Sequence, residues 1–249
     1  MVEIKTPEEI KIMAEGGKLL AVILNKLEKA VRPGIATKEL DGLAEKLILN
    51  SGGQCSFKGY QGYPSCLCTS VNEEIVHAVP SERVLKDGDI ISLDLGVLYK
   101  GFHTDMAITV PVGKVKSEVK KLVEVTKKSL AIGIKEVRPG NHLGDIGWAI
   151  QKYVESQKFN VIRDLCGHGI GRELHEDPQI LNYGKRGTGP ELKDGMVLCL
   201  EPMITAGNWR IKKSADGFSY ITQDNSLSCH FEHTTAVTKT GPEILTELV

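Results

Sequence analysis

The chain has 249 residues and a formal net charge of −1, a balance that is not typical of nucleic-acid-binding or membrane-surface proteins. This length suits one large domain or two fused halves, and an apolar content of 41 % is enough for a substantial core. The N-terminus is charged and lacks a signal-peptide core, and no apolar run is long enough to span a bilayer, which favours a cytoplasmic protein.

The N-terminal part of the chain predicts two helices. Thr6, Pro7 and Glu9 form a capping box with proline at the first helical position. Apolar residues follow at mostly helical spacing until the tetrapeptide VRPG at residues 31–34, which ends the helix. A second helix is expected over about 38–50.

A β-hairpin is expected next, with strands over 90–98 and 102–110 and turn residues near 99–101. Each strand contains an aspartate in an apolar stretch, Asp94 in the first and Asp105 in the second. In the expected register the two lie directly opposite each other on one face. Two like charges at that distance repel unless a cation lies between them.

The second half of the chain repeats the first. VRPG recurs at 137–140, 106 positions after its first occurrence, and KDG at 86–88 recurs at 193–195, 107 positions later. A helix is expected before the second VRPG, over about 117–136, and another after it, over about 144–157. The matching order and offsets indicate a duplication.

The acidic residues belong to this repeat. Asp94 and Glu201 each lie eight residues after the lysine of a KDG, in strand-like apolar sequence. Each half then has a second acid, Asp105 in the first and Glu232 in the strand-like segment HFEHTTAVT of the second. A two-fold arrangement would bring all four carboxylates to one central site.

Four carboxylates balance the charge of two divalent cations, and an oxygen-rich ligand set suits Mn, Fe, Co or Zn. A histidine would complete the set. The strongest candidate is His168 in CGHGIGRELHEDP, followed by His175 and His77. Strand alternation puts His230 on the same face as Glu232, so we expect His230 to line the site without binding metal.

Other catalytic motifs are absent. HEDPQ is not HExxH, GHGIG lacks the GxGxxG spacing, and there is no phosphate-binding GxxxxGK[ST] loop. The six cysteines include no CxxC pair, and in a chain without export signals all six are expected to be reduced thiols: Cys55, Cys66, Cys68, Cys166, Cys199 and Cys229.

The segments DLGVLYKGFHTDMA, GHGIGRELHEDP, LEPM and HFEHT resemble, in order and spacing, the metal-site segments of type I methionine aminopeptidases, a family of pita-bread metallopeptidases. The similarity runs from about Thr6 to Thr246, and the chain looks like the short prokaryotic form. The resemblance implies an α/β (α+β) pita-bread fold, with two pseudo-two-fold-related αβ halves around a central antiparallel sheet that carries a dinuclear metal site. We expect one catalytic domain over 1–249, with halves at about 1–112 and 113–249.

The resemblance also implies roles for the metal-site residues. Asp94 would hold one metal, His168 and Glu201 the other, and Asp105 and Glu232 would bridge the two. The two divalent ions (Co, Mn, Fe or Zn) would acidify a water, polarise the scissile carbonyl and anchor the substrate's α-amine. Glu201 would act as general base and then as general acid.

The substrate contacts follow from the same resemblance. His77 and His175 would contact the substrate around the scissile amide. The methionine pocket would be formed by Phe57, Tyr60, Tyr63, Cys68, Leu174 and Phe218. Phe57 and Phe218 stand where the family often has a cysteine and a tryptophan, which leaves the shape of this pocket open.

The implied function is removal of the N-terminal methionine from nascent proteins and peptides whose second residue is small, by a monomer without nucleic-acid motifs. Ribosome association is left open. One alternative is a non-catalytic pita-bread module that binds peptides or proteins. The other is a proline-specific peptidase of the same fold, which usually adds an N-terminal domain for which there is no room before Thr6.

Overall fold

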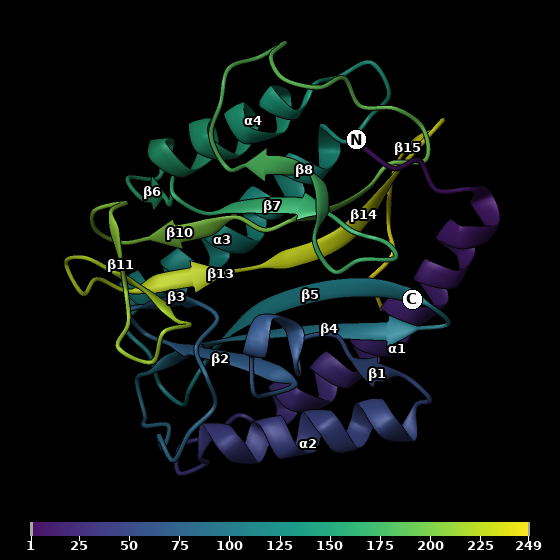
Figure 1. The fold of residues 1–249 in the computed structure, drawn as a ribbon. Helices are drawn as coiled ribbons and strands as arrows, with labels where there is room; N and C mark the ends of the chain where they lie inside the picture. Colours follow the sequence, from purple (N-terminus) through teal and green to yellow (C-terminus); the bar gives the residue numbers. More distant parts are fainter. Residues whose placement is uncertain (1, 249) are drawn as a thin grey trace.

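Four long helices lie on one side of a twisted central sheet in the computed structural model, which describes residues 2–248 (Figure 1). The helices are α1 (Pro7–Ala30), α2 (Thr37–Asn50), α3 (Ser117–Lys135) and α4 (Leu143–Ser156), with one short 3₁₀ helix, η1 (Tyr60–Gly62). The strands are β1 (Gln54–Cys55), β2 (Leu67–Val71), β3 (Glu74–Val76), β4 (Ile90–Tyr99), β5 (Phe102–Pro111), β6 (Asn160–Val161), β7 (Cys166–Gly169), β8 (Glu176–Leu181), β9 (Val197–Leu200), β10 (Met203–Thr205), β11 (Ile211–Lys213), β12 (Tyr220–Thr222), β13 (Ser228–His230), β14 (Glu232–Thr238) and β15 (Gly241–Ile244).

The helix boundaries agree with the predicted caps. The capping box of α1 is present, because Thr6 Oγ1 accepts from the Glu9 N–H and the Glu9 carboxylate accepts from the Thr6 N–H. Gly34 and Gly140, the last residues of the two VRPG segments, both have φ near +90°. Only glycine adopts this conformation without strain, so each motif ends its helix and redirects the chain in the same way.

The central sheet has nine strands and joins the two repeated parts of the chain. Its main path runs β1-β4-β5-β14-β9-β7-β8, with β2 also paired to β4 and β15 to β14. Strands β5 and β14 meet at its centre as antiparallel neighbours. Two three-stranded sheets, β13-β10-β6 and β11-β12-β3, lie beside it. Strands separated by more than 100 residues therefore lie side by side.

The hairpin formed by β4 and β5 has a different register from the predicted one. Asp94 lies opposite Ala107 and Asp105 lies opposite Gly96, so the prediction that the two aspartates face each other directly is wrong. The turn consists of two residues with positive φ, Lys100–Gly101, one position later than expected. The pairing is displaced by two residues, and because side chains alternate with a period of two, both aspartates remain on one face.

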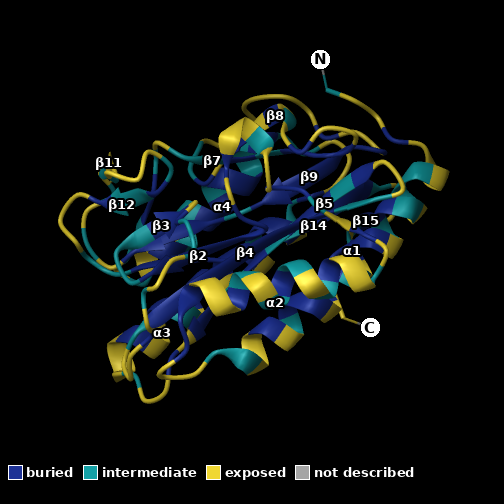
Figure 2. Cartoon of the chain, turned by 60° about the horizontal axis from the view of Figure 1, so that its bottom comes forward, coloured by how far each residue is buried: buried dark blue, intermediate teal, exposed yellow. Residues whose placement is uncertain are grey.

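Strand alternation separates the core from the other face of the sheet. Leu93 and Leu95 of β4 pack with Leu20 and Leu24 of α1 in one apolar cluster, whereas Asp94 between them points to the opposite face. A second cluster packs β9 and β14 against α3 and α4 in the same manner. Figure 2 shows buried residues on the sheet and on the inner faces of the helices. The helices thus leave one face of the sheet available for a site.

The cysteines are not all free thiols. Cys55 and Cys66 form a disulfide, so the prediction of six reduced thiols is wrong for these two. The tertiary structure explains the pairing: β1 and the start of β2 both pair with β4, which brings their Cα atoms to 5.2 Å. The unpaired thiols among the described residues are Cys68, Cys166, Cys199 and Cys229.

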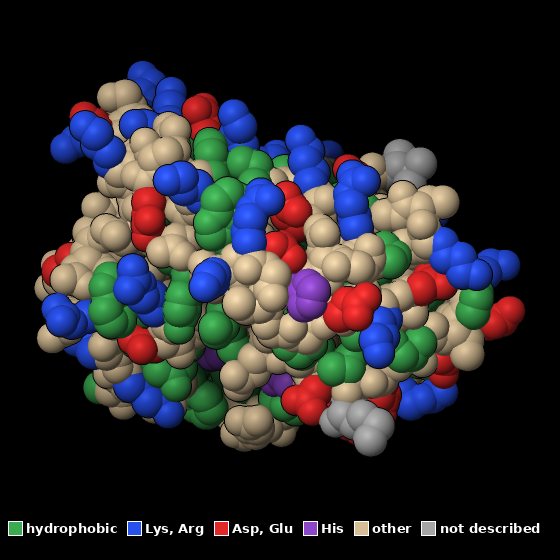
Figure 3. Space-filling view, turned by 90° about the horizontal axis from the view of Figure 1, so that it is seen from above, with side chains coloured by type: hydrophobic (Ala, Val, Ile, Leu, Met, Phe, Trp, Pro, Cys, Tyr) green, Lys and Arg blue, Asp and Glu red, His purple; other side chains and the backbone are tan. Residues whose placement is uncertain are grey.

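The exterior is charged and mixed. Figure 3 shows Lys and Arg side chains spread over the face seen from above, with Asp and Glu side chains among them. None of the helices within residues 2–248 combines the length and the apolar character needed to cross a bilayer.

Candidate metal centre and substrate pocket

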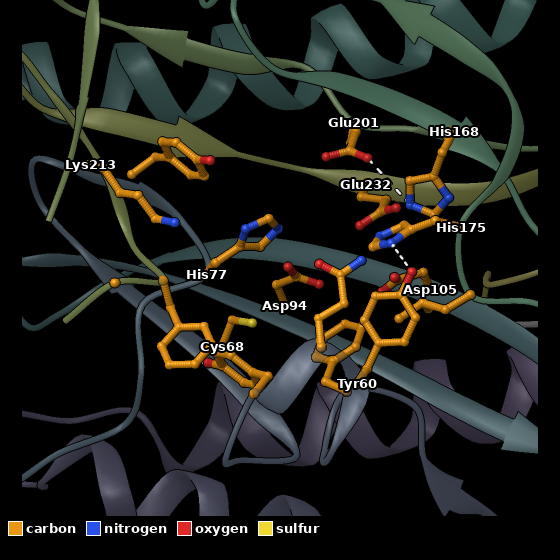
Figure 4. Close-up of a pocket in the computed structure, with 17 residues that line it drawn as sticks. Tyr60, Cys68, His77, Asp94, Asp105, His168, His175, Glu201, Lys213 and Glu232 are labelled. Carbon is orange, nitrogen blue, oxygen red and sulfur yellow. Dashed lines mark hydrogen bonds and ion pairs between the residues drawn. The ribbon is translucent and has the colours of Figure 1, made fainter.

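The four predicted carboxylates meet on the face of the sheet that the helices leave open (Figure 4). Asp94 comes from β4, Asp105 from β5 and Glu232 from the first position of β14, while Glu201 directly follows β9. Asp94 and Glu232 both lie opposite Ala107, on either side of β5. Carboxylate oxygens of Asp94, Asp105 and Glu232 lie within 4.8 Å of one another.

These carboxyl groups have raised pKa values. Burial is the largest cause in each case, and it raises the pKa of Asp105 to about 7. The pKa values of Asp94, Glu201 and Glu232 lie well above the usual range, because the charge of Asp105 adds to the effect of burial. Such a group of acids is unfavourable in ionised form unless cations neutralise it.

The residues present fit a pair of divalent cations. Asp94 Oδ1 and Glu232 Oε1 are buried and have no hydrogen-bond partner within the described part of the chain. No Lys or Arg of residues 2–248 forms an ion pair with any of the four carboxylates. Buried acceptors without donors are rare in folded proteins and need an explanation, and a metal ion supplies one.

His168 is oriented as a metal-ligating histidine usually is. Its Nδ1 donates to the carbonyl oxygen of Gly169 at 2.8 Å, which leaves the Nε2 lone pair free. Nε2 lies 3.6 Å from Glu201 Oε1. Burial, followed by the charge of His175, lowers the pKa of His168 to about 3, so the ring is neutral and can bind a cation.

Two further predicted histidines border this cluster. The His175 ring lies edge-on to that of His168, with centroids 4.3 Å apart, and its Nδ1 is 2.9 Å from the Tyr60 hydroxyl. His77 has a φ of +61°, rare for a residue with a side chain, and directs its ring into the pocket (Figure 4). Burial in the cleft lowers the pKa of His77 to about 4, so this ring is also neutral at pH 7.

The carboxylates line one end of a cavity of about 300 Å³ whose other wall is largely apolar. The Tyr63 and Phe218 rings meet edge to face at 5.5 Å, and the Tyr63 hydroxyl donates to the Ala78 carbonyl at 3.0 Å, which fixes its position. Cys68 lies opposite Asp94 in the β2–β4 pairing, so the pocket wall and the acid cluster are neighbours. The cavity is lined by every residue predicted for the metal site or the substrate pocket: Phe57, Tyr60, Tyr63, Cys68, His77, Asp94, Asp105, His168, Leu174, His175, Glu201, Phe218 and Glu232.

Several residues at the site were missed by the sequence analysis. Gln61, Lys213, Gly217 and Tyr220 also line the cavity, the last three from β11, β12 and the turn between them. Those short strands have little apolar periodicity, so no sequence signal placed them here. Cys199 was missed as well, although it precedes Glu201 by two strand positions; its sulfur groups with His168 and Glu232 as a possible ligand atom within 4.8 Å.

His230 approaches the carboxylate cluster, in agreement with the prediction that it lies on the same strand face as Glu232. Its Nε2 is 3.6 Å from Glu201 Oε2, and its ring is buried. His233 points away, with Nδ1 2.9 Å from Thr246 Oγ1.

Comparisons with known proteins agree with this arrangement. The model of metallopeptidase family M24 matches residues 11–239. Methionine aminopeptidase 1 of Bacillus subtilis is 50 % identical over 248 residues, with 100 % of both chains covered. Methionine aminopeptidase of Escherichia coli K12 is 44 % identical over 247 residues, with 98 % of this chain and 94 % of the relative covered.

Solved structures agree in fold. The crystal structure of methionine aminopeptidase from Thermotoga maritima is 47 % identical, has a TM-score of 0.98 and is matched over 99 % of this chain and 100 % of its own. A prolidase from Pyrococcus horikoshii shares the fold at 20 % identity and a TM-score of 0.79, but this chain covers only 64 % of it. The predicted pita-bread fold is confirmed.

Proposed function

The chain belongs to metallopeptidase family M24, and from that membership we propose that it removes the N-terminal methionine from peptides and nascent proteins whose second residue is small. Relatives at 43 to 50 % identity over nearly the whole chain are named methionine aminopeptidase. The observation that carries the proposal is the cluster of four carboxylates and one imidazole that lines a cavity of about 300 Å³ together with an apolar wall.

The family implies divalent metal ions, and we propose two per chain, of Co, Mn, Fe or Zn. Asp94 would hold one ion, His168 and Glu201 the other, and Asp105 and Glu232 would bridge them. The ions would supply a more acidic water and a polarised scissile carbonyl. The raised carboxyl pKa values and the buried acceptors without donors support this assignment.

The protein's own groups would move the proton and orient the amide. Glu201, at the edge of the cluster, would accept the proton of the attacking water and deliver it to the departing amine. His77 and His175 are neutral rings at the pocket and would contact the scissile amide, His175 with its ring held by the Tyr60 hydroxyl.

The pocket supports methionine as the residue that is removed. Aromatic edges from Tyr63 and Phe218 and the sulfur of Cys68 suit a flexible thioether. Phe57, Tyr60 and Leu174 complete the apolar wall. No residue of this wall is charged, so a charged side chain packed against it would lose hydration without a partner in the wall, which disfavours it.

The two alternatives are not favoured. A non-catalytic binding module would not need five metal-ligating side chains, and all five are present at one site. Proline-specific relatives share the fold at 20 to 24 % identity, and that likeness concerns the fold alone.

The remaining assignments are also proposals. We propose that residues 1–249 form one catalytic domain with halves at about 1–112 and 113–249, of which residues 1 and 249 lie outside the described part. We further propose that the protein is a monomer that acts in the cytoplasm on nascent chains. Association with the ribosome would bring it to those chains.

The test is hydrolysis of short peptides by metal-free protein reconstituted anaerobically with Co, Mn, Fe or Zn in turn. Met-Gly and Met-Ala peptides should be cleaved, and Met-Leu and Met-Lys peptides largely spared. Peptides with a penultimate proline behind other N-terminal residues serve as the control for the proline-specific alternative. Failure to cleave Met-Ala-Ser with any of the four metals would refute the proposed activity.

A further inference from the structure

His230 is a buried histidine whose ring forms no hydrogen bond within the described part of the chain. It is the last residue of β13, its side chain is 1 % exposed, and neither ring nitrogen has a hydrogen-bond partner among residues 2–248. A buried polar group in this condition calls for an explanation. The mechanism described above gives His230 no role.

The backbone of His230 is firmly held. Its N–H donates to Thr109 Oγ1 at 3.0 Å, and its carbonyl oxygen accepts from the same hydroxyl at 2.7 Å. On its other side, His230 pairs with Met203 in the β10–β13 ladder. Two neighbouring strands therefore fix the direction in which the ring points.

The ring points at the proposed general base. His230 Nε2 lies 3.6 Å from Glu201 Oε2, while His168 Nε2 lies 3.6 Å from Oε1 of the same carboxylate. Glu201 is thus flanked by two imidazoles, and only His168 has a ligand role. The 3.6 Å distance between His230 Nε2 and Glu201 Oε2 exceeds the upper limit of an N–H···O hydrogen bond by only about 0.4 Å.

Other roles for His230 fit less well. His168 supplies the one imidazole of the proposed ligand set and, unlike His230, belongs to a group of side chains whose ligand atoms lie within 4.8 Å of one another. A neutral imidazole has one N–H to donate. A proton on Nε2 satisfies that donor with the Glu201 oxygen.

We propose that His230 is a positioning residue, whose Nε2–H donates to Glu201 Oε2 and fixes the carboxylate for proton transfer. The inference rests on the proposed function, because only there does Glu201 act as a base. The orientation matters because a carboxylate that can rotate freely spends less time aligned with the proton it must accept. Removing the donor of a hydrogen bond to a charged group should therefore lower kcat by roughly 10- to 100-fold.

The test compares His230→Gln with His230→Asn. The glutamine amide nitrogen can occupy the position of Nε2, whereas the shorter asparagine reaches only the position of Nδ1. The two variants match in polarity, so a difference between them reports the donor and not a general effect on the core. His230→Gln should keep kcat for Met-Ala-Ser within about fivefold of the parent, and His230→Asn should lose about 10- to 100-fold, on the estimate given above. KM and the metal stoichiometry, measured at saturating metal, should stay unchanged in both, so that a lower kcat does not reflect lost metal.

A double-mutant cycle tests whether His230 acts through Glu201. In a Glu201→Gln background, His230→Asn should cost little further kcat, because the group it positions is already lost. Equal losses in both backgrounds, or equal kcat for the Gln and Asn variants, would overturn the proposal.

A spectroscopic measurement separates this inference from the proposed function. The ¹⁵N signals of the His230 ring should report a neutral ring protonated on Nε2, with the Nε2 signal shifted by Glu201→Gln. A proton on Nδ1 would refute the contact whether or not the protein cleaves peptides, while an inactive parent with the expected ring signals would refute only the proposed function.

Discussion

Glu201 has two proposed duties, as a metal ligand and as a base, and its surroundings differ from those of the other acids. It lies outside the regular ladder, directly after β9 and before Pro202, and its backbone carbonyl accepts from Asn182 Nδ2 at 3.0 Å. Proline disfavours the helical conformation of the preceding residue, so the backbone of Glu201 is restricted to extended geometry. Its carboxylate then lies between His168 and His230.

Replacing Glu201 with Gln preserves size but removes the basic oxygen. We expect kcat for Met-Ala-Ser to fall by roughly 10²- to 10⁴-fold, the usual share of general acid–base catalysis. Because Glu201 is also a proposed ligand, metal content must be measured in the same sample by elemental analysis. A variant that holds both metals and turns over at the parent rate would show that another group is the base.

At the scale of elements, the site is built where β4, β5 and β14 run side by side. Asp94 and Glu232 lie opposite the same residue of β5, and Asp105 is on that strand two positions before it. Helices α1 and α3 cover the face of the sheet opposite the pocket. Each strand therefore packs apolar residues against the helices and directs an acidic side chain into the pocket. Three adjacent strands thus bring three carboxylates within 4.8 Å.

Removing the middle acid should disrupt the metal site. Asp105→Ala is expected to reduce the metal content from two ions per chain and to lower activity by more than about 100-fold. Even the loss of a group that is hydrogen-bonded to a metal ligand lowers metal affinity or activity by about 10- to 100-fold. Asp194→Ala, at an exposed position outside the pocket, is the control and should behave as the parent. Full activity of a metal-free Asp105→Ala protein would be incompatible with a dinuclear site.

The disulfide joins β1 to the residue that precedes β2, the strand that carries the pocket residue Cys68. Titration of the unfolded protein without reductant should detect four thiols, and titration after reduction should detect six, since Cys55 and Cys66 are bonded to each other. Replacing both by Ser should lower the free energy of unfolding by about 3 kcal/mol, as expected for closure of a short loop. Six thiols in the unreduced sample would contradict the structure at this point.

For the whole molecule, the four buried carboxyl groups make the metal-free form dependent on pH. The pKa of Asp105 is about 7 in the folded state, compared with 3.8 for an exposed aspartate. Between these two pH values the folded protein binds more protons than the unfolded chain, so stability is greater at low pH and falls as the pH rises. For Asp105 alone, the pKa shift from 3.8 to about 7 corresponds to about 4 kcal/mol in the free energy of unfolding.

We therefore expect the Tm of the metal-free protein to fall by about 10 °C between pH 5 and pH 7.5, measured by calorimetry. Saturating Mn or Co should reverse the decrease at pH 7.5, because the cations neutralise the cluster. Asp105→Asn removes one ionisable group, so its metal-free form should lose less stability over the same pH range. Identical pH dependence in the parent and in Asp105→Asn would contradict this explanation.

Local features of this protein followed from the sequence by itself. The capping box at Thr6 and the glycines of the two VRPG segments act within a few residues, so their effect does not depend on the rest of the fold. The acids were also identifiable, because a carboxylate in an apolar strand is costly without a partner and therefore stands out. Alternation then gave the shared face of Asp94 and Asp105, because the observed register differs from the predicted one by two residues and not by one.

Only the tertiary structure decided which distant segments meet. The hairpin register depended on a two-residue turn with positive φ at Lys100–Gly101, and the Cys55–Cys66 bond on the pairing of β1 and β2 with the same strand. The position of Lys213 in the pocket, and the approach of the His230 ring to Glu201, come from strands far apart in the chain. Such contacts depend on packing free energy summed over the whole molecule, which no short stretch of sequence contains.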